Sequence, residues 1–137
     1  MSHSTASFAQ QLSDWHKALL QLTAAQGKSL KIKSGAVKRT TKEYLYYFKE
    51  KEQEETKLQG MRDQQADPHD IKQQENVVQE SSVMIPATRK SLEGQLADLK
   101  ASLSELGSAY EAAGEQKEEV DSIIAAAEEA LSKDVNS

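Results

Sequence analysis

The sequence predicts an all-α protein: an elongated, antiparallel, up-down-up three-helix bundle with coiled-coil packing. Residues that favour helices, namely Ala, Glu, Gln, Leu, Lys and Arg, make up more than half of the 137 residues, whereas Gly occurs six times and Pro twice. In two long stretches, seam residues recur every seven positions, as they do where helices pack side by side. Short connections separate the periodic stretches, so consecutive helices are expected to run antiparallel.

The central helix is expected at 68–106. Asp67 is suited to be its N-cap, Pro68 to occupy its first position and Asp70 to reach back to the cap, while Gly107 is expected to end it. Its seam is an uninterrupted heptad series: Ile71, Val78, Ile85, Leu92, Leu99 and Leu106.

Pro86 falls inside this central helix. Its ring removes one backbone hydrogen bond and clashes with the carbonyl group of Ser82. Because the heptad continues in register on both sides, we expect a kink near 82–86 and not an end of the helix.

A helix of similar length is expected upstream, at 30–64. Its heptad series is Leu30, Val37, Tyr44, Lys51 and Leu58. The charged seam residues Lys51, Glu54 and Glu55 predict that the middle of this helix is solvated or faces a polar partner.

The third helix is expected at 108–132, with Ser108 and Glu111 as its capping box. Gly114 leaves a second possibility, a start near Glu115. Its apolar stripe is expected to be Tyr110, Ala113, Val120, Ile124, Ala127 and Leu131.

The chain is divided into an N-terminal extension, 1–29, and the bundle, 30–137. The extension contains an amphipathic helix, which would be a fourth helix. Its apolar residues are Phe8, Leu12, Trp15, Leu19 and Leu22. Three alternatives remain for this stripe: packing on the bundle, a dimer contact, or an arm that binds a partner.

The residue inventory argues against catalysis and against a metal or other cofactor. The chain has no cysteine, its three histidines are scattered, and no glycine-rich phosphate loop is present. Asp67, His69 and Asp70 fit helix capping better than metal binding. Without a signal peptide or a long apolar run, the protein is expected to be soluble and cytoplasmic, with no membrane partner.

A basic strip runs from Lys28 to Lys42, with six bases and no acid, in a chain of net charge −5. Lys31, Lys38 and Lys42 share one side of the helix. Three interpretations compete: a solvated face, a docking strip for an acidic protein, and a site for nucleic acid or anionic lipid. The net negative charge argues against nucleic acid.

Four segments together resemble the tubulin-binding cofactor A family, also called tubulin-specific chaperone A. They are LKIKSGAVKR at 30–39, ADPHDIKQQENVVQES at 66–81, VMIP at 83–86 and LADLKASLSEL at 96–106. The likeness is clearest over 30–106, continues weakly to Leu131 and leaves 1–29 uncovered. The sequence departs from the family pattern at Ser82, Val83, Ala87 and Thr88.

The resemblance implies a rod-like three-helix bundle that captures β-tubulin folding intermediates after the chaperonin step. It implies further tubulin-folding cofactors as partners, a cytoskeleton-associated location and no cofactor of its own. The alternative is a non-catalytic coiled-coil scaffold or adaptor, and the oligomeric state stays open. The motif residues outside the seam, together with Lys42 from the basic strip, are the expected partner contacts: Lys33, Lys38, Arg39, Lys42, Lys72, Gln73, Gln74, Asn76, Glu80 and Met84.

Overall fold

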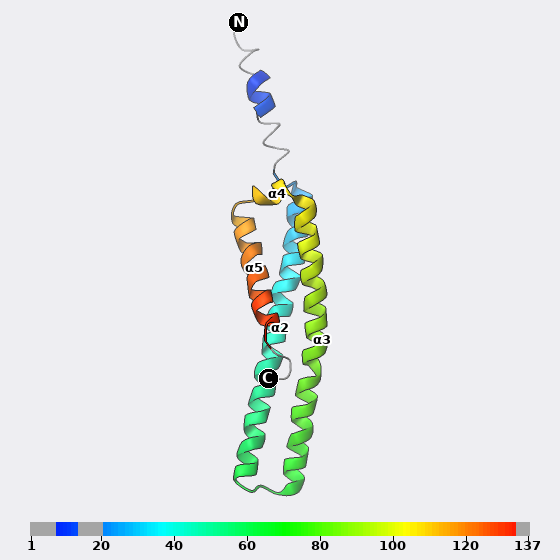
Figure 1. Cartoon of the computed structure of the whole chain (residues 1–137), viewed down its shortest axis with the longest axis vertical. Coiled ribbons are helices and arrows are strands. Elements are labelled where there is room, and N and C mark those ends of the chain that lie inside the picture. The colour runs from blue at the N-terminus through cyan, green and yellow to red at the C-terminus, as the bar shows by residue number, and fades with distance from the viewer. Residues whose placement is uncertain (1–7, 14–20, 134–137) are drawn as a thin grey trace.

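The structure is a computed structural model that describes residues 8–13 and 21–133, and within these ranges it contains helices and no strand. The labelled helices are α2 (Ala24–Asp63), α3 (Pro68–Leu106), α4 (Ser108–Glu111) and α5 (Glu115–Leu131). Figure 1 shows α2 and α3 as a long antiparallel hairpin, with α5 returning alongside its upper part. The prediction of an up-down-up three-helix bundle is confirmed.

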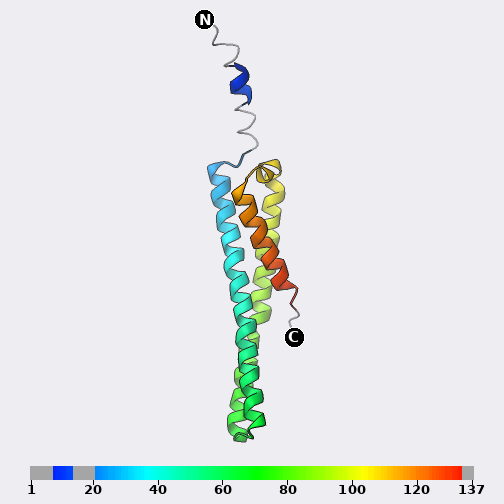
Figure 2. The same cartoon turned by 90° about the vertical axis from the view of Figure 1, so that its left-hand side faces the viewer.

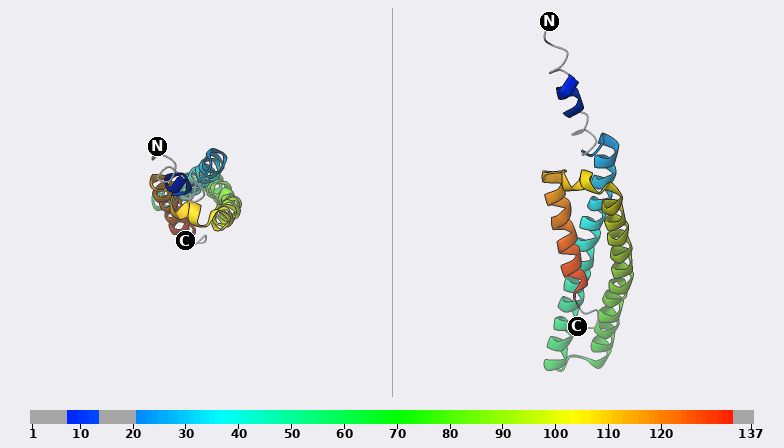
Figure 3. Two further views of the ribbon diagram at one scale, coloured as in Figure 1. Left: turned by 90° about the horizontal axis from the view of Figure 1, so that it is seen from above. Right: turned by 45° about the horizontal axis from the view of Figure 1, so that its top comes forward.

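The core follows the heptads. Its central side chains are at most 1% exposed, and α5 closes the cluster with Val120, Ile123, Ala127 and Ala130. The view along the bundle axis shows the long helices grouped around this centre (Figure 3). The most buried contributions from α2 and α3 are Leu30, Val37, Tyr44, Ile85, Leu92 and Leu99.

The third helix covers only part of the hairpin. The carbonyl oxygen of Lys133, just after α5, accepts a hydrogen bond from Arg89 (3.4 Å), and the Lys133 ammonium lies 5.8 Å from the Phe48 ring centre. Beyond this level α2 and α3 continue as a pair, as Figures 1 and 2 show. The seam residues Ile71 and Val78 are therefore only half-buried.

α2 begins at Ala24, earlier than the expected Leu30. Thr23 and Gln26 form a reciprocal capping box, in which each side chain accepts a hydrogen bond from the other residue's backbone N–H (3.0 Å). The expected border between 29 and 30 thus falls inside a continuous helix. Gly27, which resembles a helix terminator in sequence, is part of the first turn of α2.

The ends of α3 follow the sequence signals. Asp67 Oδ1 accepts the His69 N–H (2.8 Å), Pro68 occupies the first turn, and Gly107 ends the helix with φ at 54°. Asp70 lies in the first turn, but its side chain makes no hydrogen bond among the described residues, so the expected capping box is wrong. Its carboxylate still faces the favourable end of the helix dipole.

The third helical region is divided. α4 ends at Glu111, and α5 begins at Glu115 after Gly114, whose φ of 61° suits glycine. The later start is therefore correct, and the capping box expected at Ser108 is not formed, since α4 has no side-chain cap. In α5, Ile123 takes the buried position expected for Ile124, which packs at the edge of the core.

The N-terminal extension contributes little contact in the part that the structure describes. Residues 8–13 are helical and lie beyond the end of the bundle in Figure 1, with Phe8 and Leu12 63% and 50% exposed. These two side chains do not pack on the bundle as a fourth helix. Leu22 does pack against the core, whereas Trp15 and Leu19 lie outside the described residues.

Pro86 lies within α3, which stays continuous and gently bowed (Figure 3). Pro86 is exposed, so its ring adds nothing to the core, and alanine would restore an amide hydrogen. Pro86→Ala is expected to raise the free energy of unfolding, by at most about 3 kcal/mol. Urea titration followed by helical circular dichroism measures this, and an unchanged or lower free energy would show that α3 is already relaxed around proline.

Candidate functional site

The outward side of α3 carries an exposed apolar cluster among polar groups, of which one, Glu80, is charged. Val77, Val83 and Met84 are 39%, 62% and 42% exposed, and they follow helical spacing with three of the expected contact residues. We call this surface the α3 face; it consists of Gln73, Asn76, Val77, Glu80, Val83 and Met84, all of them exposed. It offers a partner an apolar centre with polar margins, a composition typical of protein interfaces.

Gln74 belongs to the interior of the hairpin. It is 6% exposed, and its Nε2 donates to the Glu54 carboxylate (2.6 Å) and to the Glu54 backbone carbonyl (3.1 Å). The middle of α2 was expected to be solvated or to face a polar partner. At Glu54 that partner is the Gln74 side-chain amide of the same chain. Because a buried polar group needs its hydrogen bonds, the pair fixes the pairing of α2 with α3.

Lys33 also connects the two long helices. Its ammonium donates to Ser102 Oγ (2.6 Å) and lies 3.6 Å from the Asp98 carboxylate. Lys33 and Gln74 thus hold α2 against α3, and neither belongs to the α3 face.

The remaining expected contacts do not gather in one patch. Lys38, Arg39 and Lys42 are exposed on α2, beside the groove between α2 and α5, and Lys72 is exposed near the start of α3. Glu115 and Glu119 of α5 form the opposite side of this groove. The structure therefore separates a basic surface on α2 from the α3 face.

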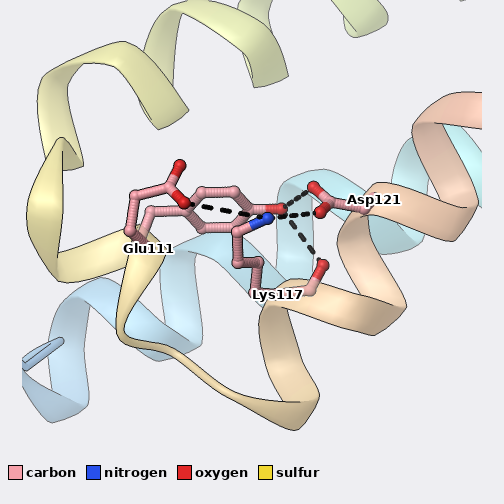
Figure 4. Close-up of polar contacts among 4 residues, drawn as sticks. Glu111, Lys117 and Asp121 are labelled. Carbon is pink, nitrogen blue, oxygen red and sulfur yellow. Dashed lines mark hydrogen bonds and ion pairs between the residues drawn. The ribbon is translucent and has the colours of Figure 1, made fainter.

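A polar cluster fixes the corner from which α5 starts (Figure 4). The buried Tyr110 donates its hydroxyl hydrogen to Asp121 Oδ1 (2.5 Å), and Lys117 donates to Asp121 Oδ2 (2.6 Å). Lys117 also lies 3.9 Å from the Glu111 carboxylate and 5.4 Å from the Tyr110 ring centre. The cluster ties α4 to α5 and so positions one wall of the groove.

Three pKa values change in this cluster. Burial, then the hydrogen bond to Asp121, raises the pKa of Tyr110. The hydrogen bonds from Lys117 and Tyr110 lower the pKa of the Asp121 carboxyl, and the hydrogen bond to Asp121 raises the pKa of Lys117. All three changes favour the arrangement with an ionised Asp121.

The Asp121 carboxylate is expected to stabilise the fold above its unfolded pKa, near 3.8, and to lose this effect as pH falls through its lower folded pKa. Asp121→Asn should therefore unfold more easily than the wild type at pH 7, by at most about 1 kcal/mol for a half-exposed group. The difference should shrink below pH 4, and adding Tyr110→Phe should reduce it at neutral pH. Urea titrations across pH give these values; a pH-independent difference would contradict the assignment.

Within residues 8–13 and 21–133, no three His, Cys, Asp or Glu side chains are grouped so that they could hold a metal ion. No helix in the same ranges is long and apolar enough to cross a bilayer.

The comparison with protein families gives a match to tubulin binding cofactor A over residues 25–131, which covers every labelled helix except the first residue of α2. The chain belongs to this family. The match begins a few residues before the segment that resembles the family in sequence and includes α4 and α5.

Named relatives agree with the family. The tubulin-folding cofactor A of Arabidopsis thaliana is 47% identical over 98 residues, which cover 72% of this chain and 87% of that protein. The human tubulin-specific chaperone A is 42% identical over 73 residues, covering 53% of this chain and 68% of the human protein.

Solved structures show the same fold. The crystal structure of the Arabidopsis thaliana cofactor superposes with a TM-score of 0.71 and 44% identity, covering 78% of this chain and 99% of that chain. The cofactor from Leishmania major gives a TM-score of 0.66 at 29% identity and covers 80% and 100% of the two chains. The elongated bundle is therefore the family fold.

Sequence reasoning found Met84 but missed the other two apolar side chains at the centre of the α3 face. Val77 adjoins the heptad residue Val78, and Val83 lies two positions before Ile85; neither valine was among the expected contacts. Their signal is present in the sequence, because an apolar residue outside the seam of a surface helix has no partner within its own bundle.

Proposed function

We propose that this protein is a tubulin-folding cofactor, which captures β-tubulin folding intermediates after the chaperonin step and holds them until other folding cofactors take them over. The family match across the whole bundle carries the proposal, and its relatives are named for tubulin folding and for a tubulin-specific chaperone. The activity is non-catalytic binding, and its site of action is the cytoplasm, in association with the cytoskeleton.

The α3 face is the proposed contact surface for the captured chain. An unassembled subunit exposes apolar area that its final partner would cover, and a side chain such as Val83 or Met84 can cover part of it without insertion into a pocket. Gln73, Asn76 and Glu80 surround these side chains with groups that can exchange hydrogen bonds. Lys72 lies beside this surface at the start of the same helix.

The rod shape supports this kind of binding. The core of α2, α3 and α5 keeps its own apolar residues buried, so the bundle can present an outer face without unfolding. Binding then costs little conformational entropy on the side of the cofactor, because α3 is already ordered.

A native pull-down with the tagged full chain tests the proposal. Tubulin chains bound to the protein are quantified by mass spectrometry, and β-tubulin is expected in clear excess over α-tubulin. Recovery of neither chain, or of both in equal amounts as assembled dimer, would contradict the proposal. Light scattering over a range of concentrations tests the alternative of a self-associating coiled-coil scaffold, for which mass should rise with concentration.

A further inference from the structure

The outward side of α2 carries bases without partners. Of the six basic side chains between 28 and 42, only that of Lys33 is paired, and the other five side chains make no hydrogen bond or ion pair among the described residues. All five are exposed, and no acid occurs in this stretch of sequence. We call this surface the α2 outer face, with Lys28, Lys31, Lys38, Arg39 and Lys42 as its bases.

Exposed apolar side chains lie in the same helical rows as these bases. Leu45 follows Lys31 and Lys38 at seven-residue spacing, and Tyr46 follows Ile32 and Arg39 in the next row. Ile32, Tyr46 and Leu45 are 62%, 59% and 38% exposed. The face from Lys28 to Tyr46 is thus about 27 Å long and combines positive charge with apolar contact area.

The groove beside this face has two different walls. Lys38 and Lys42 stand on the α2 side, Glu119 stands on the α5 side, and Leu45, Ile123 and Ala126 supply apolar surface between them. A negatively charged ligand is attracted to the α2 side and repelled by the α5 side. An apolar side chain of the same ligand could contact the groove between the two.

We propose that the α2 outer face binds an acidic protein segment that also carries apolar side chains. The inference rests on the proposed function, since it names the chemistry of one segment of the captured chain. The bases attract the acidic side chains of the segment. Ile32, Leu45 and Tyr46, which lie between the bases, can contact its apolar side chains. The segment contacts a surface separate from the α3 face.

A nucleic acid fits the same surface less well. Its phosphates repeat along the whole strand, so they would also meet Glu115 and Glu119 across the groove. A protein segment can place its acids over the α2 bases and keep its apolar residues for the groove.

Fluorescence anisotropy with a labelled peptide of repeated Glu-Glu-Leu tests the inference on the full chain. The wild type is expected to bind this peptide more tightly than poly-Glu of the same length, because poly-Glu lacks apolar groups. Lys38→Gln with Lys42→Gln should weaken binding about tenfold at low salt, and about 1 M salt should largely abolish the difference.

The matched control is Lys57→Gln with Lys90→Gln, which removes the same charge from exposed lysines outside this face. Equal loss in both double variants would overturn the inference, as would tighter binding of oligothymidylate or of phosphatidylserine vesicles than of the peptide. The tubulin pull-down is measured separately on the same variants. β-Tubulin capture without peptide binding would reject the acidic segment and leave the proposed function intact.

Discussion

Val83→Glu combined with Met84→Glu is expected to lower the affinity for β-tubulin at least about tenfold, with helical content unchanged. Both side chains are exposed, so the bundle does not need them for its core. Glutamate places charge at the apolar centre of the α3 face, where a bound chain would exclude water, and a loss of 1.4 kcal/mol in binding already corresponds to tenfold. The retained β-tubulin is quantified after native pull-down.

A matched variant separates this effect from added charge alone. Ser91→Glu with Ala97→Glu introduces the same two charges at the equivalent heptad positions, further along α3 and also exposed. This control should retain β-tubulin at nearly the wild-type level. If both variants lose binding to the same degree, net charge and not the α3 face governs capture.

Leu92→Ala is expected to reduce the free energy of unfolding by about 2–5 kcal/mol. Leu92 is 0% exposed and belongs to the core cluster to which α2, α3 and α5 all contribute, so its truncation leaves a cavity in that common core. Because the core of this rod is thin, few other buried contacts contribute to the free energy of unfolding, and the loss is not compensated elsewhere. Urea titration followed by circular dichroism at the helical band measures the change.

Ile32→Ala is the control for this truncation. Ile32 is 62% exposed on the outside of α2, so the same kind of shortening should change the free energy of unfolding by no more than about 0.5 kcal/mol. Equal effects of the two substitutions would mean that the heptad interior is not what stabilises the bundle.

The heptads made the long helices and their common core predictable. A seven-residue spacing places Tyr44 or Leu92 on one side of a helix, and that side must be buried for the helix to persist. The ends of a helix were predicted correctly where a single residue marks them, as Asp67 marks the start of α3 and Gly107 its end. The predictions missed the start of α2, where Thr23 and Gln26 form a capping box and the helix runs on through Gly27.

Contacts between helices determine features that the heptad spacing alone does not predict. Ile123 is buried in place of Ile124 because α5 contacts both long helices, so the direction of its buried side depends on their positions. Glu54 occupies a seam position that a simple pattern reserves for apolar residues, and only the antiparallel pairing brings Gln74 to it. The separation of Lys38 from Met84 likewise depends on how the helices are placed in the bundle.

Oxidative footprinting of Met84 tests the central claim most directly. Met84 is 42% exposed in the free protein, and Met61, half-buried near the far end of the hairpin, provides an internal reference in the same chain. In the complex recovered with β-tubulin, the rate of Met84 oxidation relative to Met61 is expected to fall several-fold. An unchanged ratio in a fully bound sample would show that the captured chain does not cover the α3 face.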